Sequence, residues 1–108
     1  MESSVKPNLV EKEVIAGRIT YFVNFEIEFQ DEWYIYEQVR LEFDKWHYSG
    51  VVDALVQHKY PIDKMQAVIN NYLLDHEDAY AIDEFNKMQA WRKEAKEIAK
   101  EALTYGVS

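Results

Sequence analysis

The chain has 108 residues, with 12 Lys and Arg against 20 Asp and Glu, and it contains no cysteine. This length predicts a single domain over residues 1–108 that can bury a core of its own. The net charge of −8 argues against a surface that binds nucleic-acid phosphates, and the missing thiols exclude disulfides, thiolate nucleophiles and cysteine-ligated metals.

Residues 10–15 are the first segment that reads as a strand. They either form a separate strand that turns at Ala16 and Gly17 or extend the strand that follows. The pattern is clearest over residues 18–30, where apolar and polar residues alternate. Alternation at period two is typical of a strand that buries one face.

A second alternating run begins at Trp33 and reaches Phe43. We expect the two runs to pair as a hairpin through a three-residue connection, Gln30 to Glu32, with the odd-numbered side chains in the core. The expected cross-strand pairs are Phe29 with Trp33, Ile27 with Ile35, Val23 with Val39 and Tyr21 with Leu41.

Glu37 interrupts the apolar face of the second run, because this register places it opposite Phe25 on the core side. A buried, unpaired carboxylate is costly, so either the strand bulges near Glu37 or this end of the sheet is open to solvent. We favour the bulge, which would turn Tyr34 or Tyr36 inward.

The second half of the chain is patterned at a helical period. Ser49 is expected to cap a short helix that ends before Pro61, since proline disfavours helical geometry in the residue before it. Asp63 and Gln66 have capping-box spacing and are expected to open a second helix. A third helix, over about residues 79–104, follows the acidic turn 75–78 and stops at Gly106.

These elements predict an α+β fold. An N-terminal antiparallel β-hairpin or three-stranded meander, about residues 10–46, is followed by three α-helices, about residues 49–105. The first residues carry no basic segment followed by an apolar run, and no apolar run is long enough to span a membrane. We therefore expect a cytoplasmic protein without a membrane partner.

Three sets of side chains could carry chemistry, and each has a simpler explanation. His47, His58 and His76 lie in separate connections or helix ends, without the spacing of a helical zinc pair. The acidic turn 75–78 lacks the alternating ligands and mid-loop glycine of a calcium loop and is expected to cap a helix. Glycoside hydrolysis requires two carboxyl groups that flank a cleft, one of them with a pKa raised by burial. Four carboxylates share the polar face of the hairpin near Arg40, but the solvent face of a hairpin offers no cleft: Glu26, Glu28, Glu42 and Asp44. We predict no catalytic residue, no cofactor and no metal site.

Two readings involve nucleic acid. Residues 60–75 have the spacing of a helix-turn-helix whose second helix presents Lys64, Gln66, Asn70 and Asn71 to bases, but this helix has one basic residue and the chain repels phosphate. The acidity itself suggests a DNA mimic that inhibits a nucleic-acid enzyme, which requires carboxylates spaced along one elongated face.

Aromatic residues are the most uneven feature of the chain. Ten of the sixteen lie between Tyr21 and Tyr48. If the odd-numbered set of the hairpin is core, four aromatic residues fall on its other face: Phe22, Tyr34, Tyr36 and Trp46. Amphipathic rings on an accessible face are enriched at protein interfaces, so these four are the candidate interface; helices that cover both faces would make them core instead.

The segment from about Tyr60 to Ala99 resembles short phage- and prophage-encoded proteins that belong to structural and assembly gene groups. The matching residues are Lys59-Tyr60, Asp63, Gln66-Ala67, Asn70-Asn71-Tyr72-Leu73, Glu84-Phe85, Met88, Trp91-Arg92 and Ala95-Lys96. The hairpin half has no counterpart in that pattern, and Pro61 stands where a capping Ser or Thr is expected. The resemblance implies no catalytic residue.

Together these observations favour a small, acidic, non-enzymatic interaction or assembly protein, of prophage type, that binds a protein partner or forms a homodimer through its aromatic hairpin. The alternatives are the DNA-mimic inhibitor and the helix-turn-helix DNA binder.

Overall fold

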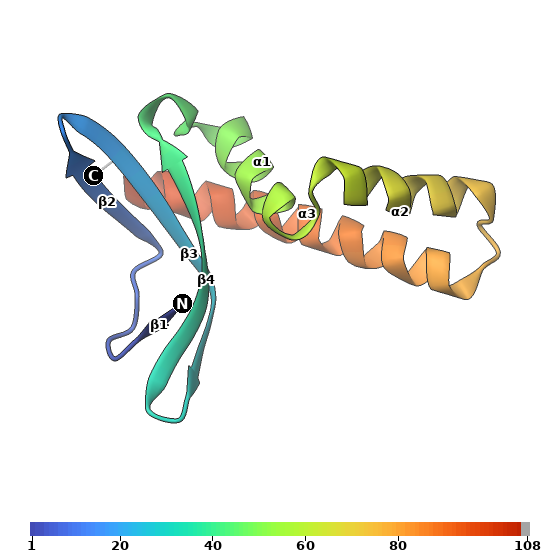
Figure 1. Ribbon diagram of the computed structural model, residues 1–108, viewed down its shortest axis with the longest axis horizontal. Helices are drawn as coiled ribbons and strands as arrows, with labels where there is room; N and C mark the ends of the chain where they lie inside the picture. Colours follow the sequence, from blue (N-terminus) through green and yellow to red (C-terminus); the bar gives the residue numbers. More distant parts are fainter. Residues whose placement is uncertain (107–108) are drawn as a thin grey trace.

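The computed structural model describes residues 1–106 and has the predicted α+β architecture (Figure 1). A four-stranded antiparallel sheet of order β1-β4-β3-β2 precedes three helices. The strands are β1 (Glu2–Ser3), β2 (Val10–Ile15), β3 (Arg18–Gln30) and β4 (Trp33–Glu42). A short 3₁₀ turn, η1 (Phe43–Lys45), leads to α1 (Tyr48–Lys59), α2 (Ile62–Leu74) and α3 (Ala79–Gly106).

Strands β2, β3 and β4 form a meander, so residues 10–15 are a separate strand that turns at Ala16 and Gly17. Both tight turns have the positive φ angles of a type I′ hairpin: 52° and 77° at Ala16 and Gly17, and 49° and 71° at Asp31 and Glu32. The β3–β4 connection therefore has two residues, and the expected three-residue connection is wrong.

The register of β3 and β4 agrees with the prediction in its inner half only. The pairs Val23–Val39, Tyr21–Leu41 and Phe25–Glu37 are confirmed. Beyond Phe25 a bulge shifts the register by one, so the outer pairs are Glu28–Ile35, Phe29–Tyr34 and Gln30–Trp33. The expected pairs Phe29–Trp33 and Ile27–Ile35 are wrong because the extra residue lies in β3, not near Glu37 in β4.

The N-terminal segment, residues 1–9, joins the two edges of the sheet. Glu2 and Ser3 pair with β4, and the carbonyl of Leu9 accepts from the backbone N–H of Asn24 at 2.9 Å. The connection between them lies on the outer side of the sheet, opposite the helices (Figure 1).

Asn24 holds this segment in place. Its side chain is fully buried, although it lies on the face of β3 opposite the core residues Val23 and Phe25. The Asn24 side-chain amide donates to the carbonyl of Asn8 at 2.8 Å and its oxygen accepts from Nε2 of Gln38 at 2.8 Å. A buried amide is tolerated because both ends are hydrogen-bonded.

The core lies between the inner side of the sheet and helices α1 and α3. Small residues recur along the covered face of α3, which lets this helix approach closely: Ala95, Ala99 and Ala102. The large residues that fill the remaining space are Val23, Phe25, Val39, Leu41, Val51, Leu55, Val56 and Trp91. The indole N–H of Trp91 donates to the carbonyl of Leu55 at 2.9 Å, so this ring joins α3 to α1.

Helices α1 and α2 begin differently from the prediction. His47, not Ser49, caps α1: its Nδ1 accepts from the backbone N–H of Gly50 at 3.1 Å. A Cβ at Gly50 would lie 2.1 Å from the carbonyl oxygen of Lys45, so glycine is needed for the close turn. Pro61 precedes α2 without any side-chain cap, and the expected capping box does not form.

Helix α2 packs against the first half of α3 as a helical arm, which extends past the sheet (Figure 1). Tyr72 of α2 stacks on Phe85 of α3 with ring centroids 4.1 Å apart. Asp78 caps the start of α3: its carboxylate accepts a hydrogen bond from the backbone N–H of Tyr80 at 2.9 Å. The molecule is elongated, with extents of 50 × 37 × 22 Å.

Candidate interaction surface

The outer end of the β3–β4 hairpin points away from the helices (Figure 1). Its direction is set by the bulge, where Glu26 has a φ of 52°. The Glu26 carboxylate forms an ion pair with Lys59 at the end of α1, and the Lys59 ammonium lies 4.0 Å from the centre of the Trp91 ring. The bulge is therefore tied to the helix layer, and the strands beyond it extend on their own.

Glu37 faces the bulge from β4 and is not buried, since about half of its side chain is exposed. It lies 3.1 Å from Nε2 of His58, which also meets the edge of the Phe25 ring. Both explanations offered for Glu37 from the sequence hold in part: a bulge exists across from it, and this part of the sheet is open to solvent.

We call residues 28–35 the hairpin tip. Because side chains alternate, a shift by one residue moves every later side chain of β3 to the other face. Phe29 thus lies beside Tyr34 on the outer side, with ring centroids 4.9 Å apart, and Trp33 and Ile35 occupy the helix-facing side. Phe29 is 63% exposed, Trp33 50% and Ile35 37%, so apolar side chains are accessible on both faces of the tip.

The hairpin tip is also acidic. Glu28, Asp31 and Glu32 are exposed within it, and no Lys or Arg occurs between Arg18 and Arg40. The exposed apolar groups therefore lie among carboxylates without a neighbouring basic residue from the same hairpin. Such a surface complements an apolar site with a basic rim.

The four aromatic residues proposed from the sequence are distributed differently. Tyr36 is buried, and its backbone pairs with Met1: the Met1 ammonium donates to its carbonyl at 2.8 Å. Trp46 stacks on Tyr21 at 4.2 Å and packs against the core, so it does not lie on the outer face. Phe22 and Tyr34 are half-buried on the outer side. Of the four, only Tyr34 belongs to the hairpin tip.

Sequence reasoning missed Phe29, Trp33 and Ile35 because alternation assigned them to the core. Strand length was the available signal. The 13 residues of β3 span about 43 Å, whereas the 12 residues of α1 span about 18 Å. Helix α1 cannot cover the whole strand. Helix α3 has 28 residues, but it crosses the strands and runs on beyond the sheet, so the outer end of the hairpin is exposed (Figure 1).

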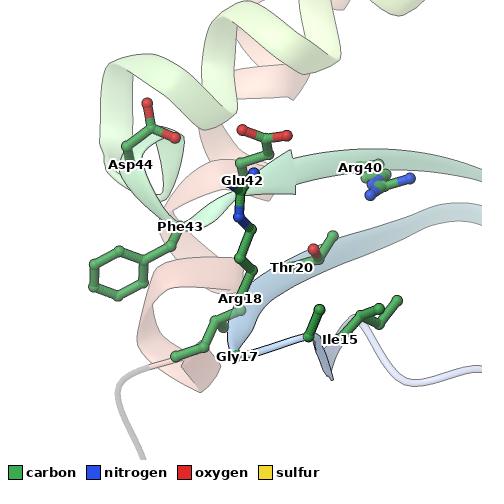
Figure 2. A pocket seen from close by; sticks show the side chains of 10 residues that line it. Ile15, Gly17, Arg18, Thr20, Arg40, Glu42, Phe43 and Asp44 are labelled. Atoms are coloured by element: carbon green, nitrogen blue, oxygen red, sulfur yellow. The ribbon is translucent and has the colours of Figure 1, made fainter.

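A concave surface lies at the opposite end of the sheet, beside the Ala16–Gly17 turn (Figure 2). Arg18, Arg40, Glu42 and Asp44 line it together with Thr20 and apolar residues of the turn and η1. Glu42 pairs with Thr20, six positions before Glu26 on β3, which places the two glutamates about 20 Å apart. The four carboxylates considered for glycoside hydrolysis therefore lie in two separate places: Glu42 and Asp44 line the concave surface, and Glu26 and Glu28 lie at the bulge.

The histidines and the acidic turn are likewise dispersed. His47 caps α1, His58 meets Glu37, and His76 lies in the turn after α2, near Tyr72. Within residues 1–106, no group of three or more His, Asp and Glu side chains is arranged to hold a metal ion.

Comparison with known proteins found no match among family models, curated proteins or solved structures. The resemblance of residues 60–99 to phage- and prophage-encoded proteins stays a prediction. No helix within residues 1–106 is long and apolar enough to cross a membrane.

Proposed function

We propose that the protein is a non-enzymatic docking protein that binds a protein partner through the hairpin tip. One observation carries the proposal: three large apolar side chains, Phe29, Trp33 and Ile35, are substantially exposed at the free end of the hairpin. The three side chains lie on both faces of one extremity, and exposed apolar groups concentrated in this way are typical of interaction sites. Aromatic residues in particular act as anchors at the centre of interfaces.

The charge around these anchors indicates the chemistry of the partner. Covering the exposed parts of the three side chains is worth about 3 kcal/mol, less than the cost of association. The remaining affinity has to come from complementary groups, and Glu28, Asp31 and Glu32 call for Lys or Arg on the partner. Pairing of two tips would place these carboxylates together, so a different, basic partner fits better than a second copy.

The nucleic-acid alternatives fit the geometry less well. Helices α1 and α2 pack against α3, and α2 has Lys64 as its one basic residue, which makes a poor recognition helix. For a DNA mimic, carboxylates should line one face without cations, yet α3 alternates both signs and pairs Lys87 with Asp83 and Lys100 with Glu97. Docking through the tip is the better-supported function.

The test is affinity selection from a displayed library of protein fragments, with wild-type protein as the target. Clones are then measured against a Phe29→Ser/Trp33→Ser variant. The matched control is Leu73→Ser/Leu74→Ser, which removes two exposed apolar side chains at the far end of the molecule. We expect clones rich in apolar and basic residues that lose at least tenfold in affinity for the tip variant, keep their affinity for the control, and weaken at high salt.

Because the tip lies beyond the helix layer, the tip variant should keep the thermal stability of the wild type within a few degrees. Equal affinity of the selected clones for the tip variant and the wild type would refute the proposal. Selection of acidic clones that bind the tip would refute the basic character of the partner, but not docking through the tip.

A further inference from the structure

The last turn of α1 contacts both strands of the hairpin at the bulge. The Lys59 ammonium forms an ion pair with Glu26 of β3, and Nε2 of His58 lies 3.1 Å from the carboxylate of Glu37 in β4. Within residues 1–106, no other side-chain hydrogen bond or ion pair joins β3 or β4 to a helix. The polar connection between hairpin and helices is therefore confined to two consecutive residues of α1.

Lys59 has a second partner, which belongs to α3. Its ammonium lies 4.0 Å from the centre of the Trp91 ring, where the negative face of an aromatic system attracts a cation. This ring is buried, and its hydrogen bond to the Leu55 carbonyl fixes its position. Lys59 thus connects three elements: α1, on which it lies, α3 through Trp91, and β3 through Glu26.

The bulge is the place where the hairpin tip can change direction. A bulge bends the strand that carries it and interrupts the ladder. Strand β2 pairs with β3 only as far as Val23, so the rest of β3 has β4 as its one neighbouring strand. From Glu26 to Asp31 the extended chain covers about 17 Å, and a rotation of about 10° at the bulge moves the turn by about 3 Å. Such a shift is as long as a hydrogen bond and would misalign the tip with a partner.

We propose that Lys59 is a positioning residue for the hairpin tip: through Glu26 it fixes the angle between the tip and the helices, and His58 supports this angle through Glu37. The inference rests on the proposed function, since the angle matters for docking only if the tip is the docking site. Lys59 lies outside the docking surface. It acts on affinity because a tip held in one direction loses less conformational freedom when it binds.

Spin labels measure the orientation of the tip without any partner, and the chain has no cysteine that would interfere with labelling. One label is attached to Gln30→Cys in the tip and the other to Glu94→Cys on α3, both at exposed positions. A second pair, Glu13→Cys with Glu94→Cys, measures the distance from β2 to α3 instead. Pulsed electron–electron resonance gives the mean and the width of each distance distribution.

Four substitutions are compared in these labelled proteins. Lys59→Met removes the charge and keeps an unbranched side chain over Trp91, Glu26→Gln removes the opposite charge, and Lys59→Arg keeps both contacts of the cation. The matched control is Lys87→Met, which breaks an ion pair within α3.

Lys59→Met and Glu26→Gln should at least double the width of the tip distance or shift its mean by about 3 Å. Lys59→Arg and Lys87→Met should leave the tip distance as in the wild type, and the β2 distance should be unchanged in all four. An unaltered tip distance in Lys59→Met would overturn the proposal. Equal broadening of the β2 distance would also overturn it, because the whole domain would then have loosened.

Affinity for the selected clones that bind the tip separates positioning from net charge. Lys59→Met makes the chain more acidic and Glu26→Gln makes it less acidic, so their effects on the attraction of a basic clone have opposite signs. Positioning predicts that both variants bind at least threefold more weakly. Opposite changes in affinity, or an unaltered affinity, would overturn the positioning role. Equal binding by the Phe29→Ser/Trp33→Ser variant would refute the docking function instead, and the label distances would still decide whether Lys59 orients the tip.

Discussion

Glu26 is a strand residue at which glycine should be more stable than alanine, the reverse of the usual order in strands. Its φ of 52° lies in the left-handed region, which costs residues other than glycine about 1–2 kcal/mol. At a regular strand position glycine is instead less stable than alanine by about 0.5–1 kcal/mol. The balance predicts that Glu26→Gly is about 1 kcal/mol more stable than Glu26→Ala. Comparing these two variants cancels the ion pair with Lys59, because neither retains it.

Glu28 provides the matched position, since it is exposed on the same strand and has no positive φ. There the order should reverse, with Glu28→Gly about 0.5–1 kcal/mol less stable than Glu28→Ala. Urea denaturation of the four variants gives the free energies of unfolding, and a difference of 1 kcal/mol corresponds to about 4–8 °C in Tm. If alanine is as stable as glycine at residue 26, that residue is not left-handed in solution and the position of the bulge is wrong.

Three further substitutions probe the core, the N-terminal segment and a surface pair. Trp91→Phe removes the donor to the Leu55 carbonyl and leaves a small cavity, so urea denaturation should give a loss of about 2 kcal/mol; a loss below about 0.5 kcal/mol would contradict the buried bond. Asn24→Ala should cost about 2 kcal/mol and accelerate hydrogen exchange in residues 1–9, whereas unchanged exchange would show that this amide does not hold the segment. The hydrogen bond from Lys87 to the Asp83 carboxylate raises the pKa of Lys87, so Asp83→Asn should return it toward 10.5 in an NMR titration. Any stabilisation from this cation is present below pH 10.5 and lost as the pH rises through the raised pKa, and a pKa that Asp83→Asn leaves unaltered would refute the assignment.

The strands and helices could be predicted because their apolar periods are long and regular. The register near Val23 and Val39 followed from the same alternation. The bulge at Glu26 could not be placed, because the sequence marks only a mismatch between Glu37 and Phe25 and does not say which strand carries the extra residue. The position of that extra residue decides which face Phe29 occupies. The candidate surface could not be predicted, because an alternating pattern does not show where a bulge lies.

The N-terminal segment was missed for a different reason. Asn24 reads as a solvent-facing residue of a half-buried strand, yet it is fully buried under residues that lie sixteen positions earlier. Pairing of β1 with β4 joins the first residues of the chain to its middle, and two residues are too short for any periodic signal. Contacts of this kind depend on tertiary structure and leave no local pattern.

The three tryptophans lie in three different environments, so their fluorescence can report on three different parts of the molecule. Trp91 is buried in the core, Trp46 is half-buried in a stack with Tyr21, and Trp33 is half exposed at the hairpin tip. A variant that keeps only Trp33, with phenylalanine at the other two positions, would emit from the tip alone. Its emission should shift to the blue when a ligand covers the tip.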